Sequence, residues 1–185
     1  LNTAIGNDQT ATISFGVDSV IVMSDSTRGV EWVDVIYETA AFERLVEVFA
    51  RAGAFIVDSE NFDHFRIANA IPGSNREYGE HSNPIEAGLL HLIDWDKGCY
   101  VGQEVIARLD AYDKVQRNVR ILKSDSPLEE GTKLMAESKP AGVVTSASNL
   151  KTAQGDYVSL ALVRMAFLET GTALLANETH VVVGE

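Results

Sequence analysis

The sequence predicts an α+β fold in which a mixed first part is followed by a run of short strands. Three observations carry this prediction: β-branched stretches near the start, an apolar helix face after them, and regularly spaced strands in the last third. Apolar residues make up 45% of the 185 residues and charged residues 23%, which is ordinary for a globular protein with a substantial core.

Three strands are expected in the first 40 residues, at 11–16, 19–24 and 30–38. Each stretch is rich in β-branched or aromatic residues, as strands are. Gly16 and Asp18 lie where the first stretch meets the second, so these two strands should form a hairpin.

Two helices and a fourth strand should follow. Thr39 is a candidate N-cap for the first helix and Gly53 a candidate stop, while FIVDS (55–59) indicates a return to strand before a short helix at about 60–67. Apolar residues at helical spacing are Phe42, Leu45, Val46 and Phe49 in the first helix, with Phe62 and Phe65 expected to be buried in the second.

Residues 71–98 have the punctuation of a long loop, because Pro-Gly, Tyr-Gly, Asn-Pro and Lys-Gly pairs recur along them. A loop of this length is uncommon in a compact domain unless it is functional. A helix should run from 103 to about 113, with one apolar side made of Val105, Ile106, Leu109 and Tyr112.

Six strand candidates occupy the last third, and their spacing is typical of a small antiparallel barrel or sandwich. The boundary before them is placed near 115–118, which divides the chain into parts of 1–116 and 117–185. The candidates are 119–123, 132–137, 142–147, 157–165, 172–176 and 180–184.

Composition and charge exclude several classes of protein. A net charge of −12 disfavours direct nucleic-acid binding, and no apolar run has the length of a membrane span. One cysteine excludes an internal disulfide, and four scattered histidines form no recognisable metal motif, so no metal site is predicted. The start has neither Met nor a secretory signal, so a processed or truncated chain of the cytoplasm, or of the mitochondrial matrix in a eukaryote, is expected.

The segment KGCYVGQE (97–104) is the most informative in the chain. Cys99 precedes the predicted helix, whose free amide groups stabilise an anion, and Lys97 adds a positive charge. Both effects favour a nucleophilic thiolate. The alternative is that Cys99 is a small buried apolar residue, as free cysteines often are. Its position between Gly98 and Gly102 is an unusual place for core packing.

KGCYVGQE closely resembles the signature of the YgfZ family, whose members are iron–sulfur assembly relatives of the glycine-cleavage T-protein. NPIEAGL (83–89), FRIANAIP (65–72), AGVVTSAS (141–148) and SLALVRM (159–165) resemble further segments of that family. The resemblance implies a T-protein-like folate-binding fold, with a ferredoxin-like α+β part followed by a small antiparallel β-barrel. It also implies that the family's N-terminal portion has no counterpart in this chain.

The resemblance assigns tetrahydrofolate as the cofactor. A buried carboxylate can accept both hydrogen bonds of a pterin edge, and the alignment gives this role to Glu80, with Glu86 as the other candidate. The folate tail carries carboxylates, and Arg117 matches the family's arginine best, with Arg120 second. The remaining candidates come from the motif: Cys99 and Lys97 for catalysis, and Tyr100 and Gln103 for cofactor binding.

Three functions follow from the resemblance. The leading one is a folate-dependent accessory protein for iron–sulfur cluster assembly or repair, whose partners would be client or assembly proteins. The first rival is an enzyme, a folate-dependent one-carbon or aminomethyl transferase of the T-protein kind. The second rival is a binding module without folate chemistry.

Overall fold

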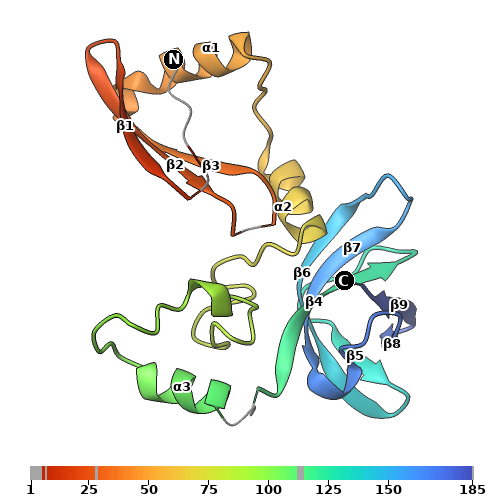
Figure 1. Cartoon of the computed structure of the whole chain (residues 1–185). Helices are drawn as coiled ribbons and strands as arrows, with labels where there is room; N and C mark the ends of the chain where they lie inside the picture. The colour runs from red at the N-terminus through yellow and green to blue at the C-terminus, as the bar shows by residue number, and fades with distance from the viewer. Residues whose placement is uncertain (1–5, 7, 28, 112–114, 185) are drawn as a thin grey trace. The chain divides into compact units, whose positions relative to one another are not determined.

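The computed structural model describes residues 6, 8–27, 29–111 and 115–184 (Figure 1). The chain divides into two compact units between Val57 and Asp58. The sequence-based division instead fell at 116/117, where the barrel begins. The difference arises because the helix that starts at Ser59 packs on the barrel strands and belongs to the same compact unit.

The first unit is a three-stranded antiparallel sheet with one helix. Its strands are β1 (Thr10–Phe15), β2 (Asp18–Asp25) and β3 (Trp32–Ile36), in the order β1-β2-β3, and its helix is α1 (Phe42–Arg51). The predicted strands, hairpin and helix are therefore confirmed. The small core consists of Val20, Ala41 and Leu45, with Ile13, Phe15, Val22 and Val35 packed against them.

The predicted ends of α1 fared differently. Thr39 does not cap it, because a 3₁₀ turn η1 (Thr39–Ala41) comes first and Ala41 is the N-cap residue. Gly53 does follow the end of the helix, with a φ of +91° that favours glycine.

The predicted strand at 55–59 is wrong. Residues 54–58 have no regular structure, and the Asp58 carboxylate accepts a hydrogen bond of 2.8 Å from the Asn61 amide as the N-cap of α2 (Ser59–Ala68). The burial expected for Phe62 and Phe65 is wrong as well, since they are 42% and 41% exposed. α2 buries Arg66 and Ile67 instead.

The long loop after α2 is confirmed. Its regular structure is limited to a 3₁₀ turn, η2 (Leu90–Leu92), and two isolated bridges, Ser74 with Tyr78 and Gly79 with Ser82. The helix that follows, α3 (Gln103–Ala111), begins where the sequence predicted. Its expected apolar side is weakly buried: Val105 is 61% exposed, and Tyr112 lies outside the described residues.

The last third forms a closed antiparallel barrel in the order β4-β7-β6-β5-β8-β9, which decides between the barrel and the sandwich. β4 closes the barrel by pairing with both β7 and β9. The strands are β4 (Arg117–Ser124), β5 (Lys133–Ala136), β6 (Lys139–Lys151), β7 (Tyr157–Arg164), β8 (Ala173–Ala176) and β9 (Thr179–Val183), with a 3₁₀ turn η3 (Met165–Phe167) after β7.

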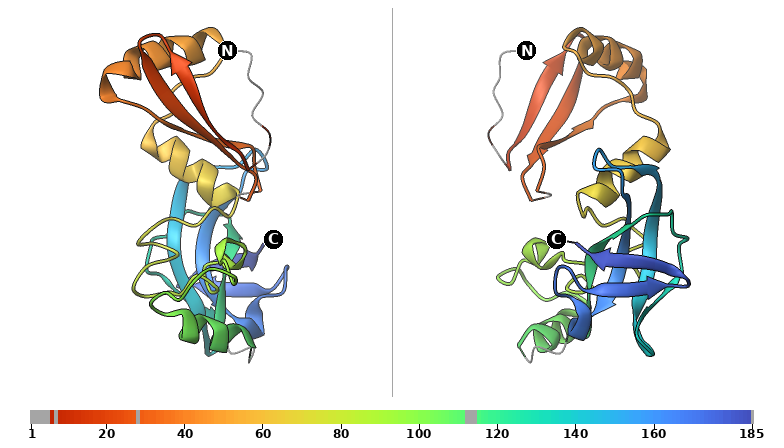
Figure 2. Two further views of the ribbon diagram at one scale, coloured as in Figure 1. Left: turned by 60° about the vertical axis from the view of Figure 1, so that its left-hand side comes forward. Right: turned by 90° about the vertical axis from the view of Figure 1, so that its right-hand side faces the viewer.

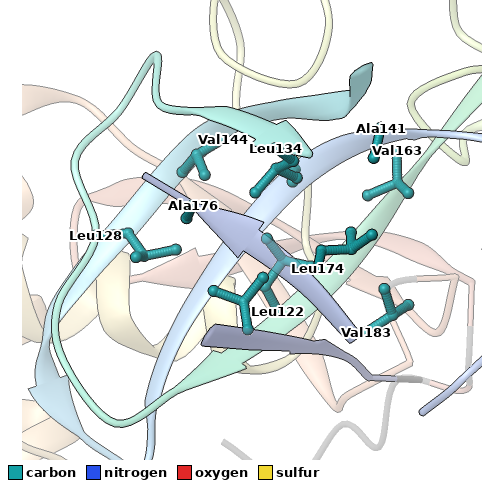
Figure 3. Packing of buried hydrophobic residues seen from close by; sticks show 11 residues of the cluster. Leu122, Leu128, Leu134, Ala141, Val144, Val163, Leu174, Ala176 and Val183 are labelled. Atoms are coloured by element: carbon teal, nitrogen blue, oxygen red, sulfur yellow. The ribbon is translucent and has the colours of Figure 1, made fainter. Parts of the chain in front are cut away.

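The barrel has an apolar face on each side of its wall. Figure 3 shows the interior cluster, in which Leu122, Leu134, Val163 and Leu174 meet. On the outside, Ile67 of α2 joins a second cluster with strand residues such as Leu160 and Leu162. Figure 2 shows α2, in yellow, against strands β6 and β7. Burial on both faces explains why β7 reads as an almost continuous apolar run.

No helix among the described residues is long and apolar enough to cross a membrane.

Candidate functional site

A cleft of about 900 Å³ opens beside the barrel, between the long loop, α3 and strands β4 to β7. Leu109, Leu134, Met135, Val143 and Leu162 give it apolar walls. Its polar groups include Asn83 and Glu86 from the loop and Arg117 from the start of β4; Lys133 and Arg164 also line it. A ligand cleft of this size, mostly apolar with a few convergent polar groups, is typical of cofactor sites.

Glu86 and Arg117 form a bidentate ion pair at this cleft. Arg117 donates from Nε to Oε1 of Glu86 over 3.0 Å and from Nη2 to Oε2 over 3.2 Å. Only about a tenth of the Glu86 side chain is exposed, so the pair lies in a poorly solvated position. Two residues that the sequence assigned to different parts of a cofactor are therefore in direct contact.

The NPIEAGL segment holds Glu86 in place. The Asn83 side chain accepts hydrogen bonds of 3.0 Å from the amides of Ile85 and Glu86, which closes a tight turn. The Glu86 carbonyl then accepts a bond of 2.9 Å from the Val119 amide of β4. The loop is thus tied to the strand that carries Arg117.

Arg117 also donates from Nη2 to the His81 carbonyl over 2.7 Å. Its Nη1 makes no hydrogen bond to any part of the chain that the structure describes, and a third of the side chain is exposed. The guanidinium therefore retains a donor for a ligand. Arg120, the second candidate, instead donates to the backbone carbonyls of Val119 and Leu168.

Glu80 is exposed and does not line this cleft. It lies at a shallower hollow of about 470 Å³, which the loop forms with Gly102, Val105 and Ile106. Glu86 lines both the hollow and the cleft. The two carboxylates predicted for the pterin thus share one neighbourhood, and Glu86 is the more buried.

Cys99 is exposed, which removes the alternative of a buried apolar residue. Its segment follows a turn in which the Asp94 carboxylate accepts bonds from the amides of Asp96 and Lys97. The Lys97 ammonium lies 4.8 Å from the centre of the Tyr100 ring, a cation–π contact. Cys99 and Lys97 line neither of the two hollows.

The other two motif residues support the start of α3. The Tyr100 carbonyl accepts a bond of 3.3 Å from the amide of Gln103, the first residue of the helix. The Tyr100 hydroxyl is buried and has no hydrogen-bond partner among the described residues. Gly102, with a φ of +93°, makes the turn into the helix.

A buried network that the sequence did not predict joins the loop to the barrel. Glu77 is fully buried and accepts four hydrogen bonds. Arg66 Nη1 (3.1 Å) and the Gly73 amide (2.7 Å) donate to Oε2, while the hydroxyls of Thr145 and Ser146 (2.6 Å each) donate to Oε1. The carboxylate is therefore fully satisfied.

A β-bulge in β6 makes this network possible. Val144 pairs with Ala161 and Ser146 with Leu160, so Thr145 is an extra residue in the strand. Both hydroxyls consequently reach the same carboxylate oxygen. A sequence shows neither a bulge nor a strand register, and the FRIANAIP resemblance was the signal nearest to this network, since it contains Arg66.

The part of the chain that the structure describes contains no group of three or more His, Cys, Asp or Glu side chains arranged to hold a metal ion.

Comparisons with known proteins agree with the fold. No family model matches the chain. The aminomethyltransferase T of the glycine cleavage system from Bartonella henselae matches with a TM-score of 0.70 over 90% of this chain and 48% of that chain, at 17% identity. This chain has a T-protein-like fold. The predicted α+β architecture with a small barrel is thereby confirmed.

Two curated proteins are similar in sequence. An Arabidopsis thaliana protein named as a chloroplastic transferase is 35% identical over 105 residues, or 57% of this chain and 24% of that protein. The aminomethyltransferase of Moorella thermoacetica is 30% identical over 110 residues, or 59% of this chain and 30% of that protein. The matches thus span about a quarter to a third of these relatives.

Proposed function

We propose that this chain binds tetrahydrofolate in the cleft beside the barrel. The observation that carries the proposal is the Glu86–Arg117 pair, which places a cation with a spare donor at the edge of an apolar cleft. The similarity to an aminomethyltransferase and the T-protein-like fold support it. A folate has an apolar ring system and an anionic tail, so apolar walls and an arginine suit its two ends.

The residues have distinct roles in this proposal. Arg117 binds a tail carboxylate through Nη1, while Glu86 fixes the plane of its guanidinium. The loop beside the hollow presents Glu80 to the pterin edge, as the alignment predicts. Tetrahydrofolate, when bound, supplies the one-carbon chemistry, and the protein contributes binding and orientation.

Calorimetry with tetrahydrofolate tests the binding role. Arg117→Ala should weaken binding by about 1–3 kcal/mol, because it removes a charge-assisted hydrogen bond and leaves Glu86 without its partner. Arg108→Ala is the matched control, since Arg108 is an exposed arginine that pairs with Glu104 on α3. Equal affinity of the wild type and Arg117→Ala would remove Arg117 from the site.

The proposed biological role is that of an accessory protein of the YgfZ kind in iron–sulfur cluster assembly or repair. The exposure of Cys99 within KGCYVGQE favours this role, because an accessible thiol can react with a partner or ligate a shared cluster. A single thiol does not hold a whole cluster, which normally has four protein ligands. A client or assembly protein would have to supply the others.

Aminomethyl transfer is the second candidate, and the name of the Moorella relative favours it. This reaction requires an oriented folate and no thiol. The two roles therefore differ in their dependence on Cys99. The accessory role predicts that Cys99→Ala impairs the maturation of cluster enzymes in cells, and that the purified natural protein releases no methylenetetrahydrofolate from an aminomethylated carrier. Efficient transfer by Cys99→Ala would establish the enzyme instead.

A further inference from the structure

The cleft has a local charge opposite to that of the whole chain. The chain carries a net charge of −12, yet the described residues that line the cleft include three cations, Arg117, Lys133 and Arg164, and one carboxylate, Glu86. Glu86 is already paired with Arg117. Two positive charges therefore remain for a ligand.

Arg117 and Arg164 are directly opposite each other on paired strands. They are the first residue of β4 and the last of β7, and they form one register pair of the antiparallel ladder. Opposite residues lie on the same face with Cβ atoms about 5 Å apart, and like charges in this arrangement are destabilising. Glu86 neutralises only one member. A residue choice that costs stability is a common sign of a functional site.

The two remaining cations have no partner within the described part of the chain. Neither Lys133, the first residue of β5, nor Arg164 makes a side-chain hydrogen bond or ion pair to a described residue, and both are exposed. They come from different strands and line the same cleft as Arg117. A single carboxylate at Arg117 would leave both of them unused.

We propose that the cleft selects folates whose tail carries several glutamates in a chain, and that Lys133 and Arg164 bind the additional carboxylates. This inference rests on the proposed folate function and extends it from the cofactor to the form of its tail. The first glutamate pairs with Arg117, and the following ones extend along Lys133 and Arg164.

The expected gain is modest, because both cations are solvated. An exposed ion pair contributes about 0.2–1 kcal/mol, so two of them should tighten binding by about two- to thirty-fold. The gain should shrink as the salt concentration rises, since exposed charges are screened over about 8 Å at physiological ionic strength.

Calorimetry with tetrahydrofolate carrying one glutamate and with its triglutamate form tests the proposal. The wild type should bind the triglutamate more tightly by the stated factor. A Lys133→Gln, Arg164→Gln double variant should lose that gain and keep its affinity for the monoglutamate. The control is Lys123→Gln, Lys151→Gln, which changes the net charge equally at exposed barrel positions outside the cleft.

The outcomes separate the two proposals. If the monoglutamate does not bind, the proposed folate function fails. If it binds but the triglutamate binds no more tightly, or if both double variants lose the gain equally, the inference about the tail is overturned while folate binding stands. Loss of the gain in the cleft variant alone supports it.

Discussion

The guanidinium of Arg66 and the carboxylate of Glu77 form an ion pair of 3.1 Å that is almost completely removed from solvent. The side chain of Arg66 is 6% exposed and that of Glu77 is 0% exposed. Arg66 also donates to Ser146 over 2.9 Å and to Asp63 over 2.6 Å. Helix α2, the long loop and strand β6 therefore meet at one pair of charges.

Removing Glu77 should strongly destabilise the chain. Glu77→Ala leaves the Arg66 charge buried without its main partner, and breaking a buried pair from one side costs about 3–5 kcal/mol. Chemical denaturation followed by circular dichroism measures this loss. Glu80→Ala is the control, because Glu80 is an exposed carboxylate of the same loop and should change the free energy of unfolding by less than about 0.5 kcal/mol. Similar losses in both variants would contradict the role assigned to Glu77.

The sequence predicted the strands and helices whose periodicity packing enforces. All six barrel strands were found, because their core-facing positions are apolar and turns separate them. The stretch at 55–59 misled because FIV has the composition of a strand but no neighbouring strand to pair with, while Asp58 caps a helix. Phe62 and Phe65 misled because α2 uses Arg66 and Ile67 toward the barrel.

The candidate site was only partly predictable from the sequence. Glu86 and Arg117 were found through the resemblance, but their mutual contact depends on the fold. Arg164 and Lys133 looked like solvent-facing strand ends, because their place in the cleft depends on the strand register. Glu77 carried no signal, since an isolated Glu in a loop normally faces solvent.

Gly142 should tolerate no side chain. A Cβ at this position would overlap the backbone carbonyl oxygen of Leu162 and come within 3.0 Å of Val163 Cα, so β6 and β7 would have to separate. Gly142→Ala is expected to lower the free energy of unfolding by about 1–3 kcal/mol or more, as overpacking does.

Gly98→Ala is the matched control for Gly142→Ala, since its Cβ meets no atom within 4 Å and its φ is not in the left-handed region. Thermal unfolding of both variants provides the comparison. An unchanged melting temperature for Gly142→Ala would show that the two strands are not as close as described.

Acid should weaken the start of α2. The hydrogen bond from the Asn61 amide, together with one from its side chain, holds the pKa of Asp58 below its ordinary value of 3.8. Because the pKa is lower in the folded state, this stabilisation is present above the unfolded value and is lost as the pH falls through the folded one. Carboxyl NMR titration measures the shift. Asp58→Asn keeps a capping oxygen and should lack this part of the acid dependence; an Asp58 pKa at or above 3.8 would contradict the cap.

Cys99 should react without unfolding of the protein. Its side chain is exposed in a segment that belongs to neither hollow, so a thiol reagent should label the native chain stoichiometrically, at a rate that does not fall when a stabilising osmolyte suppresses unfolding. Cys99→Ala should leave the melting temperature nearly unchanged, because truncating an exposed side chain creates no cavity. Labelling that appears only in denaturant, or a large loss of stability in Cys99→Ala, would mean that the thiol is buried. The accessory role proposed for Cys99 would then lose its structural basis, whereas folate binding at Glu86 and Arg117 would be unaffected, since neither residue depends on the cysteine.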